Sequence, residues 1–377
     1  MEKNNKTLNV PNLRFPEFAG EWEKCTIGDF GNVITGNTPP TAEDENYDNG
    51  THLWASPADL GTTKYIESTQ TLLSDRGFEK SRSFPANSIL VTCIGSTIGK
   101  MGMSKTEMAS NQQINTIVPV QHDANFVYYA VQSRFPRYLS SIAVQAVPIL
   151  SKSSFEKLTN YTTARKEQIK IGNLLSLIDE RIDTQKKIIE KYESLIRGLY
   201  HSVFNQPAST LQLKDVVSVV KGQQVNGEEL LEYGKYYVMN GGTEPSGYLD
   251  VCNTPANTIS ISEGGNSCGY VQYNTEPFWS GGHCYSLIQK EQSVNYQYLY
   301  HFLKYKERNI MALRIGSGLP NVQKKDLERF EIRVLPTKQQ NRVAEILEDV
   351  SAKCDLEKRI LQGWQCQKSY LLHNLFI

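Results

Sequence analysis

The stretch Arg165-Lys-Glu-Gln-Ile-Lys-Ile-Gly-Asn-Leu-Leu-Ser-Leu-Ile-Asp-Glu-Arg-Ile182 opens a segment that runs to Asn205 with almost no glycine and no proline. Along this segment apolar residues recur at alternating spacings of four and three, with Gln185 as a polar member. The apolar stripe consists of Ile171, Leu175, Ile178, Ile182, Ile189, Tyr192, Ile196, Leu199 and Val203. This heptad pattern predicts a coiled-coil helix, roughly 50 Å long at about 1.5 Å per residue.

A second segment of the same kind runs from Thr337 to Ile377. Its stripe consists of Val343, Leu347, Val350, Cys354, Glu357, Leu361, Trp364, Lys368, Leu371 and Leu375. Two such helices can bury their stripes on each other. We expect an antiparallel pair, because the second globular part starts directly after the first helix ends. Gln185 and Glu357 then meet near the middle and fix the register; alternatively, one or both face solvent.

The chain also repeats itself. Ile27–Gly36 resembles Leu213–Gly222, and Pro85-Ala-Asn-Ser-Ile89 resembles Pro255-Ala-Asn-Thr-Ile259. The glycine-rich run Gly95–Gly99 has a counterpart later in the chain, Gly265–Gly269, and the order of all these matches is preserved. A tandem duplication explains this conserved order.

Short β-branched and aromatic runs, punctuated by Gly, Asn and Pro, fill the parts outside the two helical segments. They predict two mostly β heads, and the fold class is therefore α+β with two antiparallel coiled-coil helices and an internal pseudo-twofold repeat. The expected divisions are an N-terminal leader (1–20), the first head (21–163), the first helix (164–205), the second head (206–336) and the second helix (337–377).

Composition narrows the functional class. Among 377 residues, Lys plus Arg and Asp plus Glu number 40 each, so the chain does not bind nucleic acid by bulk positive charge, although local basic patches remain open. The seven cysteines form no C-x-x-C pair, which argues against a disulfide framework or a zinc ribbon. No apolar run is long enough to span a membrane, and we expect a cytoplasmic protein.

No residue set indicates catalysis or metal binding. Asn37-Thr-Pro-Pro40 lacks the aromatic residue of a base-methylating loop, and Glu263-Gly-Gly-Asn-Ser-Cys-Gly269 lacks the lysine of a phosphate-binding loop. We therefore expect no catalytic residues and no metal site in this chain.

Two heads held apart by a stiff spacer can read two sites on one polymer, and DNA offers such sites about 3.4 Å apart per base pair. Contacts to phosphates and base edges need polar and basic side chains on exposed loops. In the first head the candidates for DNA binding are Asn37, Thr38, Lys64, Arg76, Arg82, Ser96, Thr97 and Lys100. In the second head they are Lys221, Gln223, Gln224, Asn240, Thr243, Asn266, Ser267, Arg314, Ser317, Lys324 and Lys325.

The sequence also resembles a known protein family. The resemblance lies in the opening Pro11–Trp22, in the helix starts Arg165-Lys-Glu-Gln-Ile169 and Pro336-Thr-Lys-Gln-Gln340, and in two Leu-x-His-x-x-Phe endings at Leu199–Phe204 and Leu371–Phe376. These features resemble the specificity subunit of type I restriction-modification systems, over essentially the whole chain. One departure is Gln339, which stands where the first helix start has Glu167.

The resemblance implies a non-catalytic subunit with two target-recognition domains, each reading half of a bipartite sequence in double-stranded DNA. It implies that the helices dock two modification (methyltransferase) subunits, which restriction (motor-nuclease) subunits join. S-adenosylmethionine, ATP and Mg²⁺ would be used by these partners. Two alternatives are a coiled-coil scaffold whose β-rich heads bind proteins, and a degenerate DNA methyltransferase.

Overall fold

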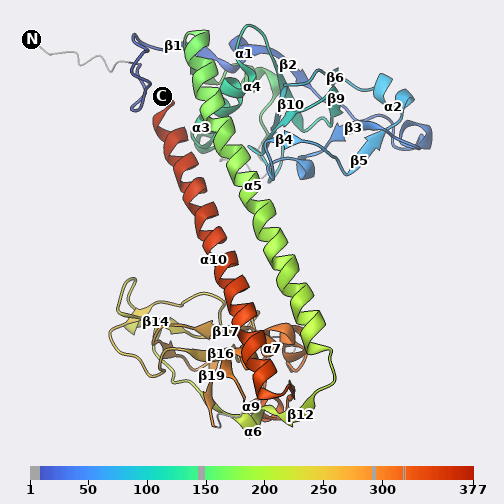
Figure 1. The fold of residues 1–377 in the computed structure, drawn as a ribbon. Coiled ribbons are helices and arrows are strands. Elements are labelled where there is room, and N and C mark those ends of the chain that lie inside the picture. Colours follow the sequence, from blue (N-terminus) through green and yellow to red (C-terminus); the bar gives the residue numbers. More distant parts are fainter. Residues whose placement is uncertain (1–8, 143–148, 291–293, 317, 319) are drawn as a thin grey trace, which may run out of the picture. The chain divides into compact units, whose positions relative to one another are not determined.

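The computed structural model describes residues 9–142, 149–290, 294–316, 318 and 320–377. The chain divides into two compact units: unit 1 comprises the residues up to Lys187 together with Arg359–Ile377, and unit 2 comprises Ile188–Lys358. Each unit holds a β-rich head and sections of two long helices, α5 (Arg165–Phe204) and α10 (Thr337–Asn374) (Figure 1). Within the described ranges, no helix is long and apolar enough to cross a membrane.

The head of unit 1 is built on a five-stranded sheet in the order β2-β10-β7-β8-β4, antiparallel except for the β4-β8 pair. Every residue of β7 is buried, as expected for an apolar strand covered on both faces. A four-stranded sheet, β5-β3-β9-β6, and the pair β1-β11 complete the head. The strands are β1 (Glu23–Thr26), β2 (Gly31–Thr35), β3 (His52–Ala55), β4 (Tyr65–Ile66), β5 (Thr71–Leu73), β6 (Ser83–Phe84), β7 (Ile89–Thr92), β8 (Met101–Ser104), β9 (Met108–Ser110), β10 (Ile114–Pro119) and β11 (Thr159–Thr162).

The head of unit 2 is built on the sheet β13-β19-β16-β17, which is antiparallel throughout. A three-stranded sheet, β15-β14-β18, and the pair β12-β20 accompany it. The strands are β12 (Ser209–Gln212), β13 (Val217–Lys221), β14 (Tyr236–Met239), β15 (Tyr248–Leu249), β16 (Thr258–Ser262), β17 (Val271–Asn274), β18 (Trp279–Ser280), β19 (Cys284–Gln289) and β20 (Glu331–Val334).

Helices and 3₁₀ turns connect the strands of both heads. In unit 1 they are α1 (Ile27–Phe30), α2 (Asp75–Glu79), α3 (Ala124–Ile142), α4 (Lys152–Glu156) and the 3₁₀ turns η1 (Asp44–Asn46) and η2 (Pro57–Asp59). In unit 2 they are α6 (Leu213–Val216), α7 (Tyr296–Tyr305), α8 (Glu307–Met311), α9 (Lys324–Glu328) and the 3₁₀ turn η3 (Gly227–Glu229).

The internal repeat is visible in the backbone of the two heads. β2-β10-β7-β8 and β13-β19-β16-β17 have the same order, and the cross-strand pair Thr35–Asn115 corresponds to Lys221–Tyr285. Two asparagines at equivalent turns, Asn87 and Asn257, have φ in the left-handed region, at 64° and 55° respectively. The duplication has therefore preserved the skeleton of the head.

Glycine is required at one equivalent position in each head. A Cβ on Gly36 would lie 2.2 Å from the carbonyl oxygen of Ser110, and a Cβ on Gly222 would lie 2.2 Å from that of Gly281. Neither backbone tolerates a side chain there, because the chain must pass directly against a neighbouring loop.

The two long helices pair in antiparallel fashion, as expected from the order of heads and helices along the chain. In unit 1 the early part of α5, with Ile171 and Leu175, shares a core with Leu371 of late α10 and with Leu375, which directly follows α10. In unit 2 the late part of α5 packs with early α10, where Leu199 and Val203 join Val343 and Leu347. The expected fold class is confirmed. The other predicted stripe residues are also buried or half-buried. They are Ile178, Ile182, Ile189, Tyr192, Ile196, Val350, Cys354, Leu361, Trp364 and Lys368, together with the polar residues Gln185, which is buried, and Glu357, which is half-buried.

The two helix-start motifs are buried hydrogen-bond anchors. Gln168 accepts from the backbone N–H of Asp123 at 3.0 Å and donates to the carbonyl of Thr163 at 2.7 Å. Gln340 repeats this in unit 2, where it accepts from the N–H of Asn295 at 2.8 Å and donates to the carbonyl of Leu335 at 2.7 Å. Each long helix is thereby fixed to the start of a helix of its head.

The two helix-start motifs differ at one position, where the first has Glu167 and the second has Gln339, and the structure explains this difference. Glu167 is buried and forms a bidentate ion pair with Arg14, with nitrogen–oxygen distances of 2.7 and 2.8 Å. Its counterpart Gln339 is exposed. A carboxylate is needed only where the N-terminal segment supplies a guanidinium.

The two Leu-x-His-x-x-Phe endings insert a phenylalanine into a head. Phe204 contacts the rings of Tyr298 and Phe302 in unit 2, at centroid distances of 5.5 and 5.4 Å. Phe376 contacts Trp22 and Phe126 in unit 1, at 6.0 and 5.6 Å. Such aromatic contacts add to the burial energy and join each helix end to a head core.

A buried histidine also joins helix and head in unit 2. His301 of α7 is 2% exposed, and its Nδ1 lies 3.0 Å from the hydroxyl of Tyr200 on α5. Its Nε2 is buried and has no hydrogen-bond partner among the described residues. Burial lowers the pKa of His301 from 6.5 to about 4.

We therefore expect an acid-sensitive contribution to stability. Between pH 6.5 and 4 the unfolded histidine binds a proton and the folded one does not, so this contribution is complete above pH 6.5 and is lost as the pH falls. Its loss between pH 7 and 4.5 is about 2 kcal/mol. Urea unfolding of wild type and His301→Gln across this range should show a shallower pH dependence for the variant. His201→Gln, at an exposed position, is the control, and equal slopes for wild type and H301Q would contradict the expectation.

Candidate nucleic-acid interface

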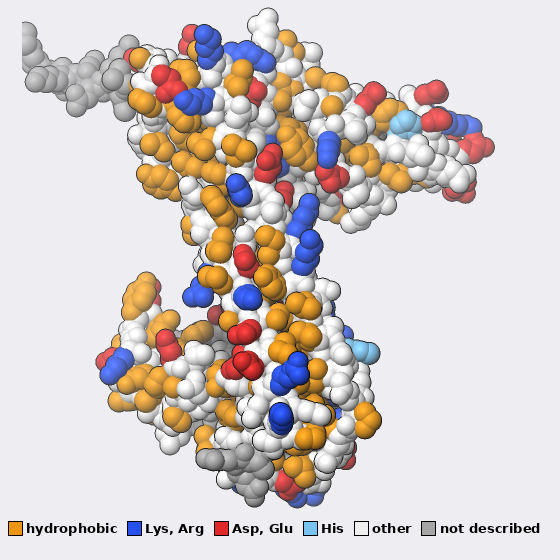
Figure 2. All heavy atoms as spheres, viewed as in Figure 1, with side chains coloured by type: hydrophobic (Ala, Val, Ile, Leu, Met, Phe, Trp, Pro, Cys, Tyr) orange, Lys and Arg blue, Asp and Glu red, His pale blue; other side chains and the backbone are white. Residues whose placement is uncertain are grey.

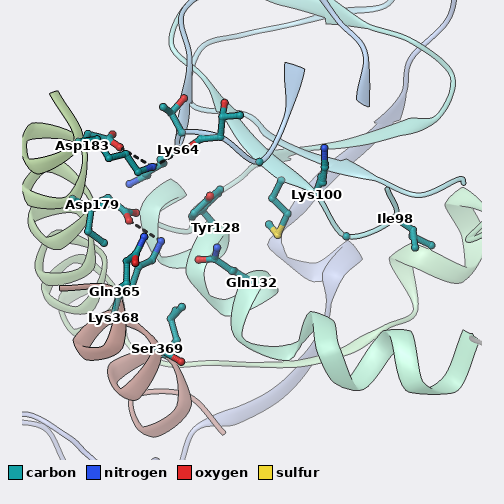
Figure 3. A pocket seen from close by; sticks show the side chains of 18 residues that line it. Lys64, Ile98, Lys100, Tyr128, Gln132, Asp179, Asp183, Gln365, Lys368 and Ser369 are labelled. Carbon is teal, nitrogen blue, oxygen red and sulfur yellow. Dashed lines mark hydrogen bonds and ion pairs between the residues drawn. The ribbon is translucent and has the colours of Figure 1, made fainter. Parts of the chain in front are cut away.

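A polar cavity of about 600 Å³ lies in unit 1, where the head meets the helices. In Figure 3 Asp179 and Asp183 project from α5, and Gln365, Lys368 and Ser369 project from α10, opposite Tyr128 and Gln132 of α3. The loop before β4 contributes Lys64, and the loop between β7 and β8 contributes Ile98 and Lys100. Lysines and carboxylates are thus mixed along its wall.

A buried ion-pair network forms one side of this cavity. Asp179 accepts a hydrogen bond from the Tyr129 hydroxyl at 2.6 Å through Oδ2 and pairs with Lys368 Nζ at 2.6 Å through Oδ1. Both oxygens of this carboxylate are therefore satisfied, one from the head and one from α10. The network holds the head against both helices within unit 1.

Lys64 lies inside the head, in contrast to the expectation of an exposed DNA contact. Its side chain is buried, and its ammonium donates to Asn125 Oδ1 at 2.6 Å and to Ser176 Oγ at 2.7 Å. Desolvation lowers the pKa of Lys64 to about 8, although the negative charge of Asp179 opposes this shift. These two acceptors hold the ammonium between α3 and α5, at the wall of the cavity.

The other candidates in unit 1 fall into three groups. Asn37, Thr38 and Arg82 come together after β2: Asn37 accepts from the N–H of Arg82 at 2.7 Å, and Arg82 donates to the carbonyl of Thr35 at 3.0 Å. Ser96, Thr97 and Lys100 lie on the loop between β7 and β8. Arg76 lies apart on α2, where it pairs with Glu43 and Glu45.

A second polar cavity, of about 570 Å³, lies within the head of unit 2. Four residues predicted from the sequence line it, namely Lys221, Asn240, Asn266 and Ser267. Glu263, His283 and Asn321 line it as well, and the sequence did not single them out as contacts. The strand register brings these residues together, so no local spacing in the sequence could reveal them.

The remaining candidates in unit 2 do not line this cavity. Gln223 and Gln224 follow β13, Thr243 is exposed after β14, and Arg314 is exposed after α8. Lys324 and Lys325 lie on α9, where Lys324 is 3.7 Å from Glu328. Ser317 lies outside the described residues.

Glu263 is the best-anchored residue of the second cavity. It follows β16, and its backbone N–H donates to the carbonyl of His283 while its own carbonyl accepts from the N–H of Val322, both at 2.8 Å. Its carboxylate Oε1 accepts from Lys221 Nζ at 2.7 Å and from the Tyr285 hydroxyl at 2.9 Å. Burial and this hydrogen bond raise the pKa of Tyr285 well above its usual value.

The surface carries both signs of charge. On the face shown in Figure 2, Lys and Arg are interspersed with Asp and Glu, in keeping with the equal totals of the two classes. Within the described ranges, no group of three or more His, Cys, Asp or Glu side chains could hold a metal ion. The side chains that line the two cavities offer hydrogen-bonding groups and local charges, which suit the recognition of a polar ligand.

Two β-rich heads with one skeleton, each with a polar cavity in its unit and each fixed to antiparallel helices, define a duplicated recognition protein. The family model of the type I restriction modification DNA specificity domain matches residues 19–194 and again 206–363. The chain belongs to this family and carries two copies of its domain.

Individual relatives agree with this assignment. A candidate type I specificity subunit of Mycoplasma genitalium is 25% identical over 284 residues, covering 71% of this chain and 74% of the relative. The type I restriction enzyme MjaVIII specificity subunit of Methanocaldococcus jannaschii is 22% identical over 420 residues, covering 99% and 95%. The crystal structure of the type I restriction-modification S subunit from M. genitalium has the same fold, with a TM-score of 0.77, 22% identity and coverage of 98% and 99%.

The ion-pair network of unit 1 makes a stability prediction. Asp179→Ala leaves the Lys368 ammonium and the Tyr129 hydroxyl without their shared acceptor, and we expect a loss of about 3 kcal/mol in the free energy of unfolding. Glu193→Ala is the matched control, because it breaks a more exposed α5–α10 pair with Lys358 and should cost less than about 1 kcal/mol. Denaturant unfolding measures both, and equal losses would refute the network's role.

Proposed function

We propose that this DNA-specificity subunit reads one half of a bipartite target in double-stranded DNA with each unit, and that its coiled coil sets the distance between the halves. The observation that carries this proposal is a common skeleton with different polar residues at equivalent positions. Thr35 and Asn115 face each other in unit 1, where Lys221 and Tyr285 face each other in unit 2. One fold with two sets of hydrogen-bonding groups suits two different base sequences.

The near-neutral charge fits a division of labour in the assembly. Phosphate contacts supply most of the affinity of a DNA-binding protein, and base contacts supply its specificity. A chain with equal numbers of basic and acidic residues is suited to reading and positioning. In this proposal the partner subunits make many of the phosphate contacts and supply much of the affinity for DNA.

Exposed apolar residues on the helices support docking of partners. In unit 1 they include Leu177 and Tyr370, which are 59% and 60% exposed, and in unit 2 they include Leu195 and Leu356. Large apolar side chains on an outer helix face are typical of protein interfaces. We assign these faces to two modification (methyltransferase) subunits, and restriction (motor-nuclease) subunits then join the complex.

The chemistry belongs to the partners in this proposal. The specificity subunit is non-catalytic by itself, and the modification and restriction subunits bind S-adenosylmethionine, ATP and Mg²⁺. Because its target is the DNA of the cell and its invaders, we place the complex in the cytoplasm. Absence of S-adenosylmethionine binding by the purified chain would agree with this assignment, and binding would contradict it.

Head exchange tests whether the units read independently. We expect that replacing residues 22–163 with the head of another family member changes one half of the methylated sequence and leaves the other half unchanged. Methylation-site sequencing of a host that also expresses the modification subunit measures this directly. The reciprocal exchange of residues 210–336 is the control, and a change of both halves in either chimera would refute independent reading.

Docking on the helices is tested separately from DNA reading. Leu177→Glu places a charge at an exposed apolar position of α5, outside the stripe that packs on α10. We expect about tenfold weaker binding of the modification subunit, because interface anchors contribute roughly 1–2 kcal/mol or more. Lys187→Glu, at an exposed position of the same helix and unit, should leave binding unchanged. Sedimentation or calorimetry gives both affinities, and tight binding by the Leu177 variant would remove this face from the interface.

A further inference from the structure

The two heads differ in chemistry at three equivalent positions around the end of the central strands. In unit 1 these are Thr35, Cys93 and Asn115; in unit 2 the same positions hold Lys221, Glu263 and Tyr285. The equivalence follows from the register, because Cys93 comes directly after β7 and Glu263 directly after β16. Three uncharged side chains in one head thus correspond to a lysine, a glutamate and a tyrosine in the other, two of which are charged.

The unit 1 trio satisfies itself. Thr35 donates to Asn115 Oδ1 at 2.7 Å, and Cys93 is buried. In the unit 2 trio one oxygen of Glu263 has no hydrogen-bond donor among the described residues. Lys221 and Tyr285 both donate to Oε1 of Glu263, whereas Oε2 is buried and has no hydrogen-bond partner in the described part of the structure.

The free oxygen belongs to a side chain that is 9% exposed and lines the cavity of unit 2. Nδ1 of His283 lies 3.8 Å from it, which is beyond hydrogen-bonding distance. A buried carboxylate oxygen without a hydrogen-bond donor destabilises the folded protein, because its lost hydration is not replaced. A ligand that donates a hydrogen bond to it would remove this penalty. His283, with 60% of its side chain exposed, is the neighbour that an entering ligand would displace.

The ligand must offer a neutral or positive donor, because an ionised carboxylate only accepts hydrogen bonds. On the edges of base pairs in the major groove, the donors are the N4 amino group of cytosine and the N6 amino group of adenine. Guanine O6 and thymine O4 are acceptors and would face the carboxylate with the same sign of charge. Lys221 beside Glu263 offsets the repulsion between this carboxylate and the DNA phosphates.

We propose that Oε2 of Glu263 accepts a hydrogen bond from the exocyclic amino group of a cytosine or adenine in the half-site that unit 2 reads. This inference rests on the proposed function and adds to it a specificity-determining residue. The fixed backbone of Glu263 and the two donors on Oε1 hold the free oxygen in place before DNA binds. Unit 1, with Cys93 at this position, has no corresponding carboxylate.

The sharpest test is Glu263→Gln. Because Lys221 and Tyr285 both donate to the Oε1 position, the amide oxygen of Gln stays there and its NH₂ group takes the position of Oε2. The acceptor becomes a donor, so E263Q should prefer guanine or thymine where the wild type prefers cytosine or adenine. A single hydrogen bond to a charged group predicts a change in preference of about tenfold at one position.

The experiment uses the full chain with its modification subunit and a duplex library in which the second half-site is randomised. The expected result is a switch at one position of that half-site, with the first half-site unchanged. Glu276→Gln removes the same charge from an exposed position of unit 2 that does not line the cavity, and should retain the wild-type target. An unchanged target with E263Q overturns the inference, as does a folded E263Q complex that loses affinity for all sequences equally.

A second measurement needs no variant and covers the case in which E263Q does not fold. The wild-type complex is titrated with target duplexes in which 2-aminopurine replaces adenine, or 2-pyrimidinone replaces cytosine, one position at a time. About tenfold weaker binding at one position of the second half-site supports the inference, and equal binding at every position overturns it. If the wild-type complex shows no bipartite preference at all, it is the proposed function that fails.

Discussion

Burial of the apolar stripe of α5 is the constraint on which the rest of the structure depends. The residues that face α10 in unit 1, such as Ile171 and Leu175, belong to the same core as Trp22 and Phe126 of the head. In unit 2, Phe204 at the end of the helix lies among the aromatic residues of α7. Within each unit, helix and head therefore share one core, and a head cannot turn on its helices without exposing apolar surface to water.

The fold could be predicted to a large extent because its determinants are periodic or repeated. The heptads predicted the two helices and the faces that they bury, since Leu347 and Leu371 stand at seam positions that are buried in the structure. The repeat predicted two copies of one skeleton, and the register of Thr35–Asn115 and Lys221–Tyr285 agrees with it. The buried glutamines at the helix starts were visible as a motif, but their anchoring role was not, because their partners lie far away along the chain.

The candidate site was less predictable, for physical reasons. A local excess of lysines does not say which one folds inward, and Lys64 is buried because Asn125 and Ser176 offer it acceptors from other elements. Glu263 was read only as part of a glycine-rich loop. Its significance depends on the strand pairing that brings Lys221 and Tyr285 to one of its two oxygens. Which polar groups are left free is a property of tertiary structure alone.

The shared core divides the surface of each head into two parts with different evolutionary freedom. Positions that meet the helices, such as Trp22 and Phe126, must stay matched to Phe376 and the stripe of α5. None of the residues that line the cavity of unit 2 belongs to the apolar core that this head shares with its helices, and among them Glu263 stands where unit 1 has Cys93. Recombination that joins a foreign head to these helices thus preserves folding when the helix-facing residues match, and new sequence preferences arise without a new scaffold.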